Sequence, residues 1–211
     1  MTISNKNQEK GFTLIELMMA TAVFSVVMLI VTTGIIRIGQ IYYRNITQNR
    51  TSEATRVISE EIVRSIQFAK GNRRAGADPA TQFCIGDTRY TYNINQKVTG
   101  GTPGLISERI SPSDACSSAA SINTQELLGE NMRLLAFDVN PVDAAERTWR
   151  VNVRVAYGDD DLLSHYNDNG TPVNPASVNT DAANADCKSG IAGGSFCATA
   201  RLDTTVKKRL N

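Results

Sequence analysis

One carboxylate stands at the front of a long apolar stretch near the start of the chain. In KGFTLIELMMATAVFSVVMLIVTTGIIRIG, which covers residues 10–39, Glu16 directly precedes the uncharged run Leu17–Ile36. Such a run reaches about the 20 residues that cross ~30 Å of hydrocarbon. A lone carboxylate deep in a bilayer costs about 2.5–3.5 kcal/mol or more, so Glu16 is expected to have a partner. The alternative is that Glu16 lies at the membrane surface, where a helix N-terminus favours an acid.

Four cysteines form the second set of reactive side chains, and none of them stands in a C-x-x-C arrangement. If the domain after the apolar run is exported, an even number of cysteines favours disulfide bonds. Zinc binding needs closely spaced pairs, and His165 is the one histidine that could help. Three pairings are open, and we favour the most local one, Cys84–Cys116 with Cys187–Cys197.

A stretch rich in side-chain oxygens, GDDDLLSHYNDNG over Gly158–Gly170, could hold calcium, which prefers oxygen ligands. The candidate ligands are Asp159, Asp160, Asp161, Asn167, Asp168 and Asn169. Their spacing does not match the EF-hand loop, and acidic loops are usually solvated, so calcium is the weaker interpretation. We expect His165 to be a surface residue. The sequence has no G-x-S-x-G motif, no P-loop and no second histidine, so we expect no enzyme and no cofactor.

Two short basic clusters could touch DNA: NRR at 72–74 and KKR at 207–209. Clusters of this size are more often solvated surface. The net charge of the 211-residue chain is +1, whereas dedicated nucleic-acid binders carry a strong basic excess. This length suits one domain and a membrane segment.

The residues before the apolar run, MTISNKNQEK, are polar and carry Lys6 and Lys10. Basic residues stay on the cytoplasmic side, so the N-terminus is predicted to be inside and the rest of the chain outside. The run is longer than the core of a cleaved secretory signal, and no A-x-A site follows it. We therefore expect a single-pass membrane protein with an exported body.

The apolar run continues without proline into an amphipathic stretch, which predicts one helix over Phe12–Ala69, about 85 Å long. Beyond Arg37, apolar residues recur at four-residue steps, interrupted by Arg50 and widened by Ile41 and Val57. The members of this row are Ile38, Tyr42, Ile46, Ala54, Ile58, Ile62 and Ile66. A coiled-coil stalk would need a cleaner heptad pattern, so we expect the outer half of the helix to pack on its own domain. KGNRRAGADPA at 70–80 ends it.

After the helix the apolar period changes to two. Alternation in 89–98, 148–157 and 196–206 predicts strands with one buried face, and MRLLAFDV at 132–139 suits a central strand. A short helix near Asn123–Leu128 is a weaker prediction. Gly158–Ser195 has no period and is predicted to be a long loop. The fold class is α+β: a long N-terminal helix, membrane half first and amphipathic half second, packed on an antiparallel β-sheet.

The basic leader, Gly11, FTLIEL and the long apolar helix together resemble the class III signal of type IV pilins and type II secretion pseudopilins. The resemblance implies that a membrane-embedded prepilin peptidase cuts between Gly11 and Phe12 and methylates the new N-terminus at Phe12. It also implies that Glu16 meets the amine of a neighbouring subunit's Phe12 during assembly. Many major pilins have a proline near Thr33–Gly34, whereas this chain has only Gly34 there.

The length and the ending FCATARLDTTVKKRLN resemble the larger, W/J-type minor pilins, which implies a role in priming assembly or at the filament tip. A major subunit, a type II secretion pseudopilin, a tip adhesin and a DNA-uptake module are the alternatives. The expected divisions are a leader (1–11), a membrane and filament-core half (12–37), an amphipathic half (38–70) and a sheet domain with a disulfide-tied loop (71–211). The implied partners are the peptidase, other pilin subunits, the inner-membrane assembly platform and membrane lipid. The implied location is the bacterial inner membrane before assembly and a pilus or periplasmic pseudopilus afterwards.

Overall fold

The computed structural model describes residues 11–69, 72–78, 80–111, 115–118, 120–163, 185–188 and 193–209. The chain divides into two compact units, the first ending at Tyr42 and the second beginning at Tyr43. The first unit holds the N-terminal part of one helix. The second holds the rest of that helix and the strands.

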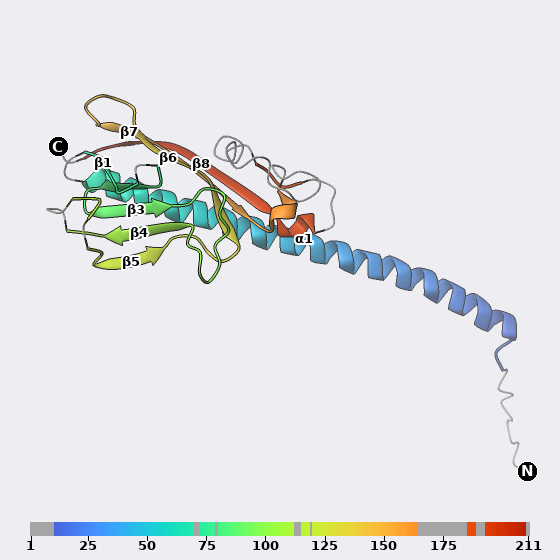
Figure 1. Ribbon diagram of the computed structural model, residues 1–211. Coiled ribbons are helices and arrows are strands. Elements are labelled where there is room, and N and C mark those ends of the chain that lie inside the picture. Colours follow the sequence, from blue (N-terminus) through green and yellow to red (C-terminus); the bar gives the residue numbers. More distant parts are fainter. Residues whose placement is uncertain are drawn as a thin grey trace, which may run out of the picture. The chain divides into compact units, whose positions relative to one another are not determined.

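The helix α1 runs over Leu14–Phe68 and contributes to both units (Figure 1). This confirms the prediction of one long N-terminal helix. Its continuity follows from the absence of proline, which would remove a backbone donor and clash with the preceding turn. It ends just before a glycine and an asparagine, Gly71 and Asn72, which favour a turn.

The strands form two antiparallel sheets, which confirms the α+β class but differs from the single sheet expected. One sheet has the order β1-β2-β3-β4-β5 and the other has the order β6-β7-β8. An isolated parallel bridge joins Ile94 to Leu134. The ladder of β3 stops at Tyr92 because the chain turns away there, with Asn95 at a left-handed φ of 61°. The elements are β1 (Arg74–Ala75), β2 (Gln82–Ile85), β3 (Thr88–Tyr92), β4 (Leu105–Arg109), β5 (Asn123–Glu126), β6 (Met132–Pro141), β7 (Thr148–Tyr157), β8 (Ala198–Lys207) and the 3₁₀ turns η1 (Asp160–Leu162) and η3 (Gly194–Phe196).

The main core joins the second half of α1 to both sheets. Ile58, Ile62 and Ile66 are at most 1% exposed and belong to the same apolar cluster as Phe83 of β2 and Val153 of β7. A fully buried isoleucine contributes about 1.5–3 kcal/mol relative to an exposed one. In β7 the predicted alternation is confirmed, since Trp149, Val151, Val153 and Val155 are buried and the residues between them are not. The helix stripe and the sheets thus cover each other.

Part of the predicted apolar row on the helix is wrong. Its N-terminal members, Ile38 and Tyr42, are exposed. The buried face of the helix is formed by Thr47, Thr51, Thr55, Ile58, Ser59, Ile62 and Ile66. A step of four residues turns about 40° more than one full turn of a 3.6-residue helix, so a four-residue row winds away from a straight face. The row and the buried face coincide only near Ile58–Ile66. On the N-terminal side of Ile58, the buried face consists of Thr47, Thr51 and Thr55.

β6 is an edge strand rather than the predicted central one. Both faces of β6 are apolar because each is buried in a different cluster. Leu134 and Phe137 lie in the main core, while Leu135 belongs to a second cluster. The other members of the second cluster are Ala156, Leu162, Leu163, Ala185 and Cys197. The register shift between Leu134 and Ala136 lets two successive leucines be buried.

The stretch 123–126 is the strand β5, not the weakly predicted helix. It pairs with β4 from Ile106↔Glu126 to Arg109↔Asn123. The Glu126 carboxylate accepts hydrogen bonds from the backbone N–H groups of Gly104, Leu105 and Leu128. These tertiary contacts outweigh the weak local preference of a polar segment.

Candidate processing and assembly site

Residues 11–13, directly before α1, are exposed. Gly11 and Phe12 precede the helix, and Phe12 is 86% exposed. A Cβ added at Gly11 would meet nothing within 4 Å, so packing does not require glycine there. Glycine, which has no side chain, leaves the backbone open to approach at this position.

Thr13 and Glu16 form a capping box at the start of α1. The backbone N–H and the hydroxyl of Thr13 donate to Glu16 Oε2 at 2.9 and 2.8 Å. The backbone N–H of Glu16 donates in return to Thr13 Oγ1 at 3.4 Å. This is the S/T-x-x-E arrangement that satisfies the orphan donors of a helix N-terminus. Glu16 therefore has a partner within its own chain, and both bonds that it accepts use the same oxygen.

In the part of α1 from Leu17 to Tyr42, the described residues of the chain leave the side chains uncovered. Residues 14–42 are exposed except for Gly34 and Gly39, and a helix of this length and composition can cross a membrane. Its few hydroxyls bond back to the helix: Ser25 Oγ donates to the Thr21 carbonyl and Thr32 Oγ1 to the Met28 carbonyl, each at 2.8 Å. These bonds satisfy the hydroxyl donors, which lowers the cost of transferring them into an apolar medium.

Two glycines lie within this apolar half. A Cβ on Gly34 or Gly39 would meet nothing within 4 Å, so neither glycine is required by a neighbour in its own chain. Each costs roughly 1 kcal/mol of helix stability relative to alanine. Small residues let another helix approach closely, which favours helix–helix contacts in a membrane or filament.

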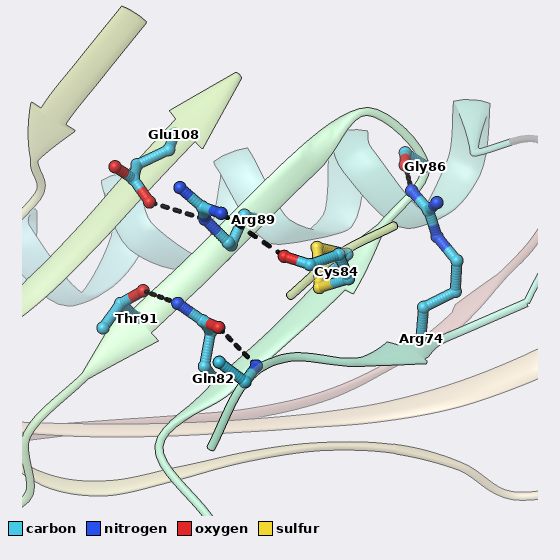
Figure 2. The surroundings of a disulfide bond; sticks show 9 residues. Arg74, Gln82, Cys84, Gly86, Arg89, Thr91 and Glu108 are labelled. Atoms are coloured by element: carbon cyan, nitrogen blue, oxygen red, sulfur yellow. Dashed lines mark hydrogen bonds and ion pairs between the residues drawn. A yellow bond between two sulfur atoms is a disulfide. The ribbon is translucent and has the colours of Figure 1, made fainter. Parts of the chain in front are cut away.

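The structure pairs Cys84 with Cys116 and Cys187 with Cys197, the connectivity favoured from the sequence, with Cα atoms 5.9 and 5.7 Å apart. Figure 2 shows the first bond beside a nearly buried ion pair, in which Arg89 Nε lies 2.7 Å from Glu108 Oε2. Arg89 also donates to the Cys116 carbonyl at 3.3 Å. The disulfide and the hydrogen bond from Arg89 to the Cys116 carbonyl together fasten the segment around residue 116 to the five-stranded sheet.

The second disulfide belongs to a small cluster at one end of the three-stranded sheet. Leu163 and Cys187 form an antiparallel bridge, and the buried Arg133 forms an ion pair with Asp160. Arg133 also donates to the Gly158 carbonyl at 3.1 Å. Residues 164–184, which make up most of the predicted loop, lie outside the described residues.

The calcium candidates are divided by the structure. Asp159 pairs with Lys97 at 2.8 Å, and Asp160 pairs with Arg133. Within the described ranges no group of three or more His, Cys, Asp or Glu side chains could hold a metal ion. Asp161 is exposed, and the other candidates, Asn167, Asp168 and Asn169, as well as His165, lie outside the described residues.

The NRR cluster makes contacts within the fold. Arg73 lies over the ring of Phe83 at 4.7 Å, and its backbone N–H donates to Glu146. Arg74 donates to the Gly86 carbonyl at 2.6 Å (Figure 2). These contacts favour a structural role for both arginines over a role in DNA binding. In the KKR cluster, the backbone of Lys208 donates to Arg147 and that of Arg209 to Gln67.

Two contributors were missed from the sequence. The cap residue Thr13 was signalled by the spacing T-x-x-E in TLIE, which we interpreted only as part of a processing motif. Arg133 had no signal, because its partner Asp160 and the carbonyl of Gly158 are brought to it by the sheet and not by the local sequence.

Residues 6–32 match the family described as "Prokaryotic N-terminal methylation motif". The match covers Gly11, Phe12 and Glu16. No curated protein and no solved structure matches the chain. The motif and the long apolar helix suggest membrane anchoring, and together with the antiparallel sheets they are consistent with a type IV pilin-like architecture.

Proposed function

We propose that this pilin-like chain is a prepilin: a structural filament subunit that is cut after Gly11, N-methylated at Phe12 and assembled through α1. One observation carries the proposal. The methylation motif at residues 6–32 leads into a helix half that is apolar and exposed on all sides. Such a surface requires lipid or other helices as cover, and a filament core supplies the latter.

The geometry around the cut suits a peptidase. Gly11 and Phe12 lie outside the helix and are exposed, so the scissile backbone is accessible. A glycine on the leader side leaves the bond unshielded by a side chain. Lys10 and Lys6 hold this bond at the cytoplasmic face. The prepilin peptidase is therefore the first partner of the chain.

Glu16 supplies the assembly contact. Both hydrogen bonds from Thr13 go to Oε2, and among the described residues no bond to Oε1 is found. A carboxylate accepts about four hydrogen bonds, so an ammonium group can bind Oε1 while the capping box stays intact. The amine of Phe12 on a neighbouring subunit is that group. An ion pair in a dry filament core requires good geometry, and the box holds the carboxylate in one orientation.

Within this function we propose a minor subunit that primes assembly on the inner-membrane platform or lies at the tip of a pilus. The support is resemblance to the larger minor pilins in length and ending. A type II secretion pseudopilin is the alternative. A gene for a retraction ATPase beside this one would favour a pilus, and genes for outer-membrane secretion components would favour the pseudopilus.

The first experiment is mass spectrometry of the protein from cells with an active prepilin peptidase. We expect a mature chain that begins at Phe12 and carries one methyl group on its amine. Gly11→Val should keep residues 1–11, because its branched side chain blocks the backbone from the peptidase groove. A native protein that retains its leader would contradict the proposal.

The second experiment measures filament incorporation of Glu16→Ala. We expect processing to continue and incorporation to be lost, because the variant has no carboxylate for the neighbour's amine. Glu53→Ala is the matched control, since Glu53 is an exposed acid in the second half of α1. Normal incorporation of Glu16→Ala would instead indicate a membrane-anchored domain that does not assemble through this residue.

A binding module at the tip, either an adhesin or a DNA receptor, is the second candidate. Its support is the long segment between the Arg133–Asp160 ion pair and the Cys187–Cys197 disulfide. Deleting residues 166–182 spares both anchors. Loss of surface or DNA binding with intact filaments would support this role, and unchanged binding would contradict it.

A further inference from the structure

A cavity of about 880 Å³ opens beside the C-terminal end of α1, at the turn that joins β2 to β3. Its lining belongs entirely to the second unit. Pockets that hold small ligands typically enclose about 300–1,000 Å³, so the size is sufficient. The charged residues of the lining are Glu61, Arg64, Arg74, Asp87 and Arg109. Three arginines therefore face two carboxylates, and this excess of positive charge favours a ligand with a negative group.

The turn between β2 and β3, which forms one wall of the cavity, is held against the end of the helix. Gly86 has a φ of 62°, and a Cβ there would lie 3.3 Å from the Cα of Ala69. Arg74 donates to the Gly86 carbonyl at 2.6 Å, as Figure 2 shows. The backbone N–H of Ile110 donates to the Asp87 carbonyl at 2.8 Å. Because this wall is already ordered, a ligand loses little of its binding energy to ordering it.

Arg64 and Arg109 keep donors that a ligand can use. The guanidinium of Arg64 has no hydrogen bond or ion pair among the described residues, and its side chain is exposed on α1. Arg109 Nε lies 3.7 Å from Asp87 Oδ2, beyond hydrogen-bond distance, and the Arg109 side chain is 68% exposed. A guanidinium offers its N–H donors in a planar fork, which fits a carboxylate with two parallel bonds. The two arginines therefore suit a carboxylate ligand.

The lining also offers partners for hydroxyl groups. The buried Tyr90 hydroxyl donates to Ser65 Oγ at 2.8 Å, which leaves the Ser65 hydroxyl hydrogen to donate to a ligand. The Glu61 carboxylate has no hydrogen bond or ion pair in the part of the chain that the structure describes, so it can accept from a hydroxyl. Phe68 is 56% exposed and adds an apolar surface to the lining. A ligand with one acid, several hydroxyls and an apolar face matches these groups together.

We propose that this cavity binds an acidic sugar. The guanidinium groups of Arg64 and Arg109 bind its carboxylate. Its hydroxyls bond Glu61 and Ser65, and its apolar C–H face lies on Phe68. The charge excess of the lining is small, which disfavours a polyanion such as DNA and favours a ligand with a single acid. An acidic peptide would supply the carboxylate without the hydroxyls. The inference goes beyond the filament role and does not depend on it.

The test titrates the full chain in detergent micelles with methyl glucuronide and, separately, with methyl glucoside, and follows the ligand signals by NMR. The two sugars differ only in a carboxylate that replaces a hydroxymethyl group. We expect saturable, millimolar binding of the acid and much weaker binding of the neutral sugar. Arg64→Gln and Arg109→Gln should each weaken binding of the acid at least about tenfold, the factor that a lost charge-assisted hydrogen bond gives.

Arg56→Gln is the matched control, because Arg56 is an exposed arginine of α1 that pairs with Glu60 outside the cavity. Its binding of the acid should be unchanged. Arg64 and Arg109 are exposed, so their variants should fold normally, and the fluorescence of the buried Trp149 checks this. Deleting residues 166–182 should also leave this binding intact, since the cavity is lined by other elements.

Equal binding of the acid and the neutral sugar, or no binding of either, would overturn the inference. An equal loss in Arg56→Gln would show a general effect of charge and would overturn it too. If a glutamate peptide or inorganic phosphate displaces the acid and binds as tightly, the cavity binds anions without reading a sugar, and the assignment is wrong. Filament incorporation is measured separately, so failure of the sugar site leaves the proposed assembly role untouched.

Discussion

The two halves of α1 are one helix in different surroundings. In residues 14–42 all side chains are exposed, whereas from Thr47 to Ile66 seven positions are buried by the sheets. The first half is apolar around its whole circumference, and the second has one apolar face. A helix that is apolar all round is stable only inside something larger. The sequence of the first half is therefore suited to partners outside the chain, and that of the second half to packing against the chain's own sheets.

The largest expected effect comes from truncating a buried residue of the second half. Ile62→Ala should lower the free energy of unfolding by about 2–5 kcal/mol, because Ile62 is fully buried in the main core. Val27→Ala, in the exposed first half, should leave the unfolding of the second unit unchanged. Urea denaturation in detergent, followed by the fluorescence of the buried Trp149, measures both. Equal effects would show that the two halves unfold as one body.

Both disulfides lie in the second unit, which contains the second half of α1. Chain entropy predicts about 3.7 kcal/mol for a closed loop of 32 residues and about 2.7 kcal/mol for one of 10. Replacing Cys84 and Cys116 with serine should therefore destabilise the second unit more than replacing Cys187 and Cys197. The same denaturation measurement compares the two double variants. A reversed order would mean that the small cluster around Leu163 carries more of the stability than the five-stranded sheet.

How far the sequence predicts this structure also differs between regions. The helix and the alternating strands follow from local pattern, as β7 illustrates with its buried Trp149, Val151 and Val153. β5 does not, because its strand form depends on pairing with β4 and on the contacts of Glu126. β6 was misplaced because Leu135 is covered by residues distant in sequence.

The candidate site divides in the same way. The motif around Gly11 and Glu16 is contiguous, so it can be recognised in the sequence without a fold. The ring contact between Tyr43 of α1 and Phe196 of η3 joins residues that are far apart in the sequence, and only the packing of β8 beside α1 brings them together. The threonine face of the helix, formed by Thr47, Thr51 and Thr55, was likewise not predicted from the sequence. Its residues are polar, and the four-residue apolar row winds away from it.

A smaller effect is expected at the start of the first half. Thr13→Ala removes the cap hydroxyl, which donates a hydrogen bond to the Glu16 carboxylate. Loss of an N-terminal cap typically costs about 1 kcal/mol of helix stability. The cost should stay local: amide exchange of Leu14–Leu17 should accelerate about fivefold, because 1 kcal/mol is a factor of about five. The urea midpoint of unfolding of the second unit, followed by Trp149 fluorescence, should not change. Thr13→Ser keeps a hydroxyl and should restore slow exchange. Unchanged exchange in Thr13→Ala would mean that the box contributes nothing to the helix end.

The smallest expected effect is a gain in stability, and it contrasts two serines of α1. Ser59 is 3% exposed, and its hydroxyl has no hydrogen-bond partner among the described residues. Ser25, in the first half, is exposed and donates to the Thr21 carbonyl. A buried hydroxyl without a partner opposes folding, and alanine is also the better helix former. Ser59→Ala should therefore raise the free energy of unfolding by about 0.5–1 kcal/mol.

Ser25→Ala is the matched control, and it should leave the Trp149 transition where it is, since the first half does not take part in that core. If Ser59→Ala instead destabilises the second unit, its hydroxyl has a partner such as a bound water, and the threonine face of α1 is wetter than its burial indicates. That result would narrow the difference between the two halves, because polar contacts as well as apolar packing would then join the helix to the sheets.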